Sequence, residues 1–156
     1  MPDLLNPLNL FALGFEILIK SLFALAIIKT LNEISEKNRK IVPGLVWLLV
    51  IPGFNVIWNF FVALRLSQSL KDELDERDFE VAGKPTLIIG LAYALISASA
   101  LFIPQPKNVQ DVQNGLLYGV LGIAAIVTFV QYWMKINWFK KVLQNDSVEN
   151  DGKDQL

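Results

Sequence analysis

Long apolar stretches without any charged side chain dominate this chain. Three of them hold 24, 22 and 23 residues and occupy positions 41–64, 85–106 and 112–134. A fourth apolar stretch, near the N-terminus, is interrupted only by Glu16 and Lys20. A helix needs about 20 apolar residues to cross the roughly 30 Å hydrocarbon layer of a bilayer. The pattern therefore predicts an all-α fold, an integral membrane bundle of about four transmembrane helices.

The boundaries of these helices follow from prolines and from the return of polar residues. The predicted spans are 8–28, 41–64, 85–103 and 115–134, in a single domain over 1–143. After the second span, leucines every fourth residue predict an amphipathic helix over 65–79 that continues outside the bilayer. The tail 144–156 is polar and acidic, so it is expected to be disordered. A soluble bundle is disfavoured, because its surface helices would need a polar face that these segments lack.

Pro52 and Gly53 interrupt the second span near its middle. A proline inside a helix removes a backbone donor and clashes with the preceding turn, so a kink or break is expected here. We favour a single span kinked at Pro52. The alternative is a re-entrant element that enters the membrane and leaves on the same side, which would change the number of crossings and the orientation.

Composition excludes several classes of function. The chain has no histidine and no cysteine, which removes thiol nucleophiles, Ser-His triads and most zinc, copper and haem sites. With a formal net charge of −1 it lacks the basic surface that nucleic acid requires. The acidic start, Met1-Pro2-Asp3, does not match a cleaved signal peptide. We expect no catalytic residue, no metal site and no cofactor.

Lysine and arginine counts give an orientation, since these residues accumulate on the cytoplasmic side. With four spans, one side of the membrane carries eight of these residues and the other carries five, Lys20 lying within the first span. The side with eight holds the 65–84 loop and the C-terminal tail. We therefore expect both termini in the cytoplasm.

Glu16 and Lys20 are four residues apart and face the same direction on the first helix. Charges inside a bilayer cost about 2.5–3.5 kcal/mol on insertion scales, so they usually face protein or water. We favour an internal ion pair that locks helix packing. The alternatives are a polar site on an ion or proton pathway, or a helix that lies at the membrane interface.

Asn55 and Asn59 share one face in the same way, just after Pro52. Their amides could line a polar cavity, as broken helices do in transporters, although interhelical hydrogen bonding is the simpler interpretation. If their face meets Glu16 and Lys20, the four residues form one intramembrane polar site.

Small residues on the later spans are expected to pack helices closely. One face holds Gly90 and Ala94, with Ala98 one turn further on. The other face holds Gly115, Gly119 and Gly122. The acidic stretch 72–80 lacks the glycine and the spacing of a calcium loop, so it is expected to be a solvated helix face.

The segment 51–70, IPGFNVIWNFFVALRLSQSL, resembles a pattern in small multi-spanning bacterial membrane proteins of unknown function. The resemblance covers the proline, the asparagine before a tryptophan, and the helix that leaves the membrane. It implies a location in the bacterial cytoplasmic membrane.

The leading functional hypothesis is a non-catalytic accessory subunit that packs in the lipid bilayer against other membrane proteins or copies of itself. The alternative is a small transporter or channel that uses Glu16, Lys20, Asn55 and Asn59. An intramembrane enzyme comes third, with Glu16 and Lys20 as the acid–base pair.

Overall fold

The computed structural model describes residues 6–81, 83–103 and 111–153, and no strand occurs among them. The predicted all-α class is confirmed. The elements are α1 (Pro7–Asn32), the 3-10 helices η1 (Glu36–Asn38) and η2 (Pro43–Val50), α2 (Phe54–Glu76), α3 (Leu87–Ser99) and α4 (Val112–Lys153).

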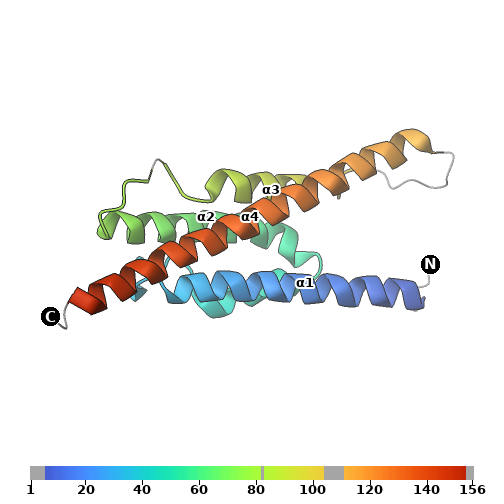
Figure 1. Cartoon of the computed structure of the whole chain (residues 1–156). Coiled ribbons are helices and arrows are strands. Elements are labelled where there is room, and N and C mark those ends of the chain that lie inside the picture. The colour runs from blue at the N-terminus through green and yellow to red at the C-terminus, as the bar shows by residue number, and fades with distance from the viewer. Residues whose placement is uncertain (1–5, 82, 104–110, 154–156) are drawn as a thin grey trace.

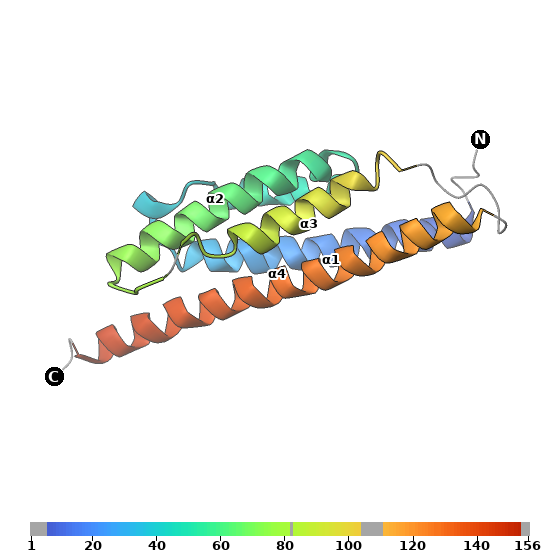
Figure 2. The same cartoon turned by 90° about the horizontal axis from the view of Figure 1, so that it is seen from above.

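Three helices run in one direction and one runs against them. α1, α2 and α4 all point toward the end of the bundle where the chain finishes, and α3 points the opposite way (Figure 1). Seen from above, α2 and α3 lie together beside α1 and α4 (Figure 2). α3 packs between α2 and α4, and α1 contacts η2 and α4. As a result, α1 begins and α4 ends at opposite ends of the bundle.

The second apolar segment is not one kinked helix, which corrects the favoured prediction for 41–64. η2 ends at Val50, Gly53 adopts a φ of +80°, and the chain then turns back as α2. Two hydrogen bonds join the arms. The indole of Trp58 donates to the Leu45 carbonyl at 2.9 Å, and the amide of Lys40 donates to the Ser69 hydroxyl at 2.8 Å. The bonded residues are 13 positions apart in the pair nearer to Gly53 and 29 positions apart in the pair farther from it, as in a hairpin.

The remaining helices differ from expectation mainly at their ends. α2 runs without a break from Phe54 to Glu76, so the expected amphipathic helix is its second half. α3 is shorter than the expected span, since it begins at Leu87 and ends at Ser99. α4 continues for 42 residues to Lys153. The expected disorder of 144–156 is therefore wrong as far as Lys153, and its last three residues lie outside the described part.

One layer of tightly packed residues crosses the bundle and provides a reference level. The Phe23 ring lies 4.9 Å from Phe129 and 5.6 Å from Tyr132, measured between centroids. Gly90 lies against Tyr132 and Ala63, leaving no room for a larger residue. We call Phe23, Ala63, Gly90 and Tyr132 the central layer. It ties all four α-helices together at one height.

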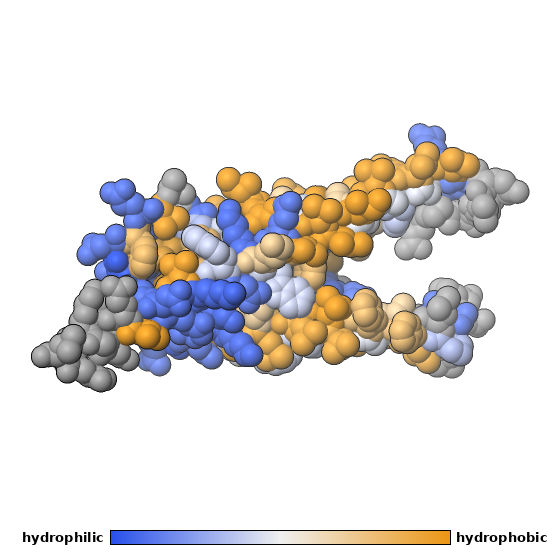
Figure 3. Space-filling view, in the orientation of Figure 1, coloured by the Kyte–Doolittle hydropathy of each residue, from blue (hydrophilic) through white to orange (hydrophobic). Residues whose placement is uncertain are grey.

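The two sides of the central layer have different surfaces. Toward the end where α1 begins, the surface is largely apolar, and toward the end where α4 finishes it is strongly polar (Figure 3). Two helices, Asn9–Asn32 and Val112–Val148, are long and apolar enough to cross a membrane, and only 17% and 6% of their most apolar windows are buried in this chain. Core helices of soluble proteins bury most of such a window, so this exposure favours a lipid environment.

Candidate functional site

The charged pair on α1 forms as its spacing predicts. The Lys20 ammonium donates to the Glu16 carboxylate one turn earlier on the helix. The Lys20 side chain is 17% exposed and the Glu16 side chain is 50% exposed. The ion pair therefore lies partly inside the bundle, with its acidic member nearer the surface.

The hairpin tip and the start of α2 lie opposite this pair. Gly53 precedes α2 and provides no side chain to cap it. The first turn of a helix presents backbone N–H groups and a partial positive charge of about half an elementary unit. Its polar side chains, Asn55 and Asn59, follow within the next two turns.

A cavity of about 330 Å³ joins the two faces. The structure thus brings together the four residues that the sequence singled out. The lining residues are Glu16, Lys20, Gly53, Asn55, Val56, Asn59, Tyr93, Ser97 and Leu101. Three helices contribute to this lining, because the α1 pair faces the hairpin tip and α3 closes the third side.

The two asparagines are buried without partners. Asn55 is 7% exposed and Asn59 is 8% exposed, and neither side chain makes a hydrogen bond within the described residues. Among the residues that the structure describes, these amides make no interhelical hydrogen bond, which was the simpler expectation. The amide atoms of Asn55 and Asn59 are not fully cut off from solvent, so water or a ligand in the cavity can bond to them.

A second polar cluster, which the sequence did not predict, lies at the other end of the bundle. Glu73 is 2% exposed, so the expected solvated face is wrong at this position. Its carboxylate accepts from the amide and hydroxyl of Ser35 at 3.0 Å, from Asn38 at 2.8 Å and from Arg77 at 2.8 and 3.0 Å. The i, i+4 spacing of Glu73 and Arg77 is a sequence signal for an ion pair. The other partners of Glu73 lie in 35–38, too far away in the sequence for a local pattern to predict them.

Arg77 connects this cluster to the rest of the bundle. Its guanidinium donates to the carbonyls of Leu143 at 3.0 Å and Glu33 at 3.1 Å, and to the Asp146 carboxylate at 3.0 Å. The end of α1, the end of α2 and the polar part of α4 are thus held by one side chain. We call Glu73, Arg77 and their partners the polar clamp.

The pKa of Glu73 reflects these contacts. Burial alone raises the pKa of the carboxyl, but hydrogen bonds from Asn38, Arg77 and Ser35 together lower it below its ordinary value. The pKa of Arg77 is raised, since its bonds to Glu73 and Asp146 outweigh the opposing effect of burial. Both groups are therefore charged at neutral pH, and the polar clamp holds the ends of α1 and α2 against α4.

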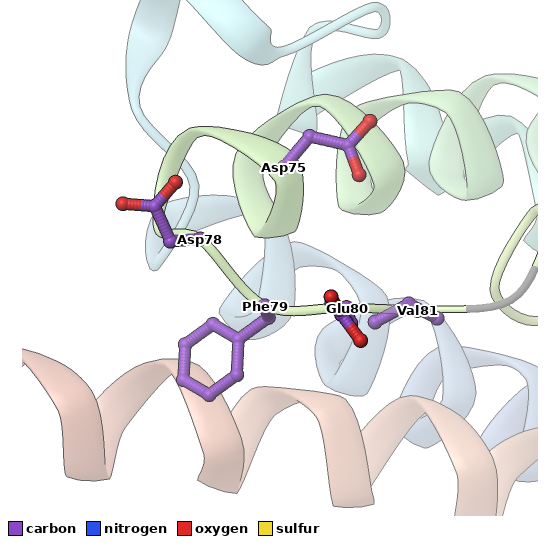
Figure 4. A pocket seen from close by; sticks show the side chains of 5 residues that line it. All are labelled: Asp75, Asp78, Phe79, Glu80 and Val81. Carbon is purple, nitrogen blue, oxygen red and sulfur yellow. The ribbon is translucent and has the colours of Figure 1, made fainter.

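A larger cavity, about 790 Å³, is an open acidic groove that follows the end of α2. Figure 4 shows Asp75 and Asp78 pointing in different directions, with Glu80 further along the chain. The Asp75 carboxylate is already paired with Lys71 at 2.7 Å. No group of three acidic side chains able to hold a metal ion occurs within the described residues.

The two small-residue faces have different surroundings. A Cβ atom added at Gly90 would lie 2.9 Å from the Tyr132 ring and 3.0 Å from Ala63, and Ala94 is fully buried, so this face packs helices as expected. A Cβ atom at Gly115, Gly119 or Gly122 would meet nothing within 4 Å. Within the described chain, the second face packs against no other element.

Comparison of the chain with models of protein families, with curated proteins and with solved structures finds no match. Any inference about function therefore depends on the geometry of the cavity and of the polar clamp.

Proposed function

We propose that this chain is a multi-pass membrane protein that binds a small polar solute inside the membrane, in the cavity between α1, the hairpin tip and α3. The observation that carries the proposal is the convergence of Glu16, Lys20, Asn55 and Asn59 on one cavity in the apolar part of the bundle. Transporters build such sites from broken helices near the middle of the bilayer.

The arrangement of elements supports three membrane crossings and one re-entrant hairpin. α1, α3 and α4 cross, while η2 and the first half of α2 enter and leave on the same side. α3 alone spans about 20 Å at ~1.5 Å per residue, so residues 100–103 complete its passage. In contrast to the four-span arrangement, the ends of the chain then lie on opposite sides of the membrane.

The distribution of basic residues agrees with this topology. Twelve of the 14 lysines and arginines lie on the clamp side of the central layer. They are Lys29, Lys37, Arg39, Lys40, Arg65, Lys71, Arg77, Lys84, Lys135, Lys140, Lys141 and Lys153. The four-span arrangement divides these twelve residues eight to four. Because basic residues favour the cytoplasmic side, the polar clamp and the end of α4 are assigned to the cytoplasm.

The depth of the cavity fits an intramembrane site. Glu16 precedes Lys29, which lies in the last turn of α1, by 13 residues, or about 20 Å of helix. Gly53 precedes Arg65 by 12 residues, or about 18 Å. In a hydrocarbon layer of roughly 30 Å, both positions lie a few ångströms beyond the midplane as seen from the cytoplasmic side.

Thiol labelling tests this proposal directly, since the natural chain has no cysteine. We expect an Asn59→Cys variant in intact membranes to react with a charged, membrane-impermeant thiol reagent. An Ile57→Cys variant is the matched control, because Ile57 lies on the same helix, is 72% exposed and would face lipid. If the two variants react at equal rates, the cavity is not water-accessible and the proposal fails.

The accessory-subunit hypothesis remains as a second candidate, and one observation favours it. The first halves of α1 and α4 form separate apolar arms (Figure 3), and Gly115, Gly119 and Gly122 on α4 meet no other part of the described chain. A partner helix could pack closely there. Cross-linking from a cysteine at Gly119 in native membranes would reveal such a neighbour, whereas labelling by lipid-soluble reagents alone would argue against it.

A further inference from the structure

We infer that the solute bound in the cavity is a small zwitterion with an apolar side chain, of the amino-acid class. This inference rests on the proposed function and specifies its ligand. It depends on three features of the cavity: the charges present, the unpartnered amides and the apolar lining.

The first feature is that the cavity presents both signs of charge. Glu16 and Lys20 bond to each other and to no other described side chain. A ligand with a single charge would pair with one of them and leave the other uncompensated in a poorly solvated place, which is costly. A zwitterion can pair with both at once.

The second feature is a set of groups able to fix the orientation of the ligand. α2 begins at the cavity with no side-chain cap, and its partial positive charge favours a carboxylate. Helix termini occur widely without ligands, but here Asn55 and Asn59 line the same cavity, are more than nine-tenths buried as residues, and have amides without a hydrogen-bond partner within the described chain. We therefore place the carboxylate of the ligand between α2 and Lys20, and its ammonium group at Glu16.

The third feature is the remaining lining, which is apolar or aromatic apart from Gly53 and the hydroxyl of Ser97. Val56, Tyr93 and Leu101 complete the wall of the cavity. Its volume of about 330 Å³ is at the small end of the range for ligand pockets, roughly 300–1,000 Å³. An aliphatic side chain of a few carbon atoms fits this surface, whereas a sugar or a nucleotide would leave polar groups against it.

Leucine and two analogues with a single charge provide the test. The full chain in lipid nanodiscs is titrated with leucine, with 4-methylpentanoate, which lacks the amine, and with 3-methylbutylamine, which lacks the carboxylate. Calorimetry is expected to show leucine binding at least about tenfold more tightly than either analogue. Equal affinities for the three compounds would overturn the inference.

Single variants should change the charge preference in opposite directions. Glu16→Gln should weaken leucine binding relative to 4-methylpentanoate, and Lys20→Met should weaken it relative to 3-methylbutylamine. The double variant is neutral and avoids a lone charge in the membrane. It should fold, as judged by its size in detergent, and lose the preference for leucine; an unchanged preference would contradict the assignment.

The outcomes separate this inference from the proposed function. If Asn59→Cys is labelled but leucine does not bind, the cavity is water-accessible and the zwitterion assignment is wrong. If Asn59→Cys is no more reactive than Ile57→Cys, the proposed function and this inference both fail. Selective binding of an analogue would support a solute site and replace the ligand class.

Discussion

α1 and α2 each carry an acid followed four residues later by a base, and the two pairs have different surroundings. Glu73 on α2 and Arg77, the residue that caps the end of α2, are bonded to side chains and carbonyls from three other segments. Glu16 and Lys20 on α1 bond only to each other within the described structure, beside two asparagines that have no partner there.

The comparison shows how a structural pair differs from a candidate site. In the polar clamp every strong donor and acceptor is used, so the pair can hold segments together and has little capacity left for a ligand. The pair on α1 lines a cavity with unused hydrogen-bonding capacity. Identical spacing in the sequence thus gives two roles, and the number of remaining partners distinguishes them.

Removing the base of the polar clamp should have the largest effect. Arg77→Met leaves Glu73 charged and buried, and breaking a buried pair costs about 3–5 kcal/mol. Lys71→Met is the control on the same helix, because its partner Asp75 is exposed and such pairs contribute less than about 1 kcal/mol. Unfolding of the protein in mixed micelles, followed by circular dichroism, measures both. Similar losses in the two variants would show that the clamp is not structural.

Neutralising the pair on α1 should lower the free energy of unfolding by less, and the loss should depend on whether one or both of Glu16 and Lys20 are replaced. Glu16→Gln or Lys20→Met alone leaves one charge in the apolar half of the bundle, at a cost of about 2.5–3.5 kcal/mol. The double variant should lose less than the sum of the two by roughly 0.5–3 kcal/mol. The same unfolding measurement gives the coupling, and strict additivity would mean that the residues do not act as a pair.

Small residues allow the central layer and the apolar arm of α4 to be compared without changing any charge. Gly90→Ala should cost about 1–3 kcal/mol, since the new methyl group would lie 2.9 Å from the Tyr132 ring. Gly119→Ala adds the same atom to open space inside a helix, where alanine is more favourable than glycine, so it should leave the free energy of unfolding unchanged or raise it by up to about 1 kcal/mol. A large loss at Gly119 would instead show that a second chain packs on that arm.

The sequence predicted the pieces of the candidate site better than the overall topology. The spacing of Glu16 and Lys20, and of Asn55 and Asn59, fixes which side chains share a helix face, because the helical period is local. Pro52 marked the interruption of the helix, but a proline alone does not distinguish a kinked helix from a reversal of the chain. The reversal depends on contacts such as that of Trp58 with the Leu45 carbonyl, which local patterns do not contain.

The polar clamp could not be predicted for a similar reason. Glu73 lies in an acidic stretch whose composition indicates a solvated face, and its burial follows from partners some 38 residues earlier in the chain. The end of α4 was expected to be disordered because it is polar. Bonds from Arg77 to Leu143 and Asp146 instead fix it against the bundle, which composition does not report.

The titration of Glu73 is expected to have the smallest effect of these changes on the free energy of unfolding. The pKa of Glu73 is lower in the folded protein than its ordinary 4.5, because hydrogen bonds from Asn38, Arg77 and Ser35 outweigh burial. Its contribution to the free energy of unfolding is therefore fully present above pH 4.5, and is lost as the pH falls through the lower folded value. Each tenfold difference in the acid dissociation constant between the folded and unfolded chain corresponds to about 1.4 kcal/mol.

The Glu73→Gln variant isolates this contribution, because the other carboxylates titrate in both proteins. The difference in free energy of unfolding between the natural chain and the variant should be constant from neutral pH down to about 5, and should shrink at lower pH as Glu73 becomes protonated. Micelles of uncharged detergent keep the surface potential unchanged during the titration. A difference that grows toward low pH would mean that the folded protein favours the protonated acid, and that burial rather than the clamp governs Glu73.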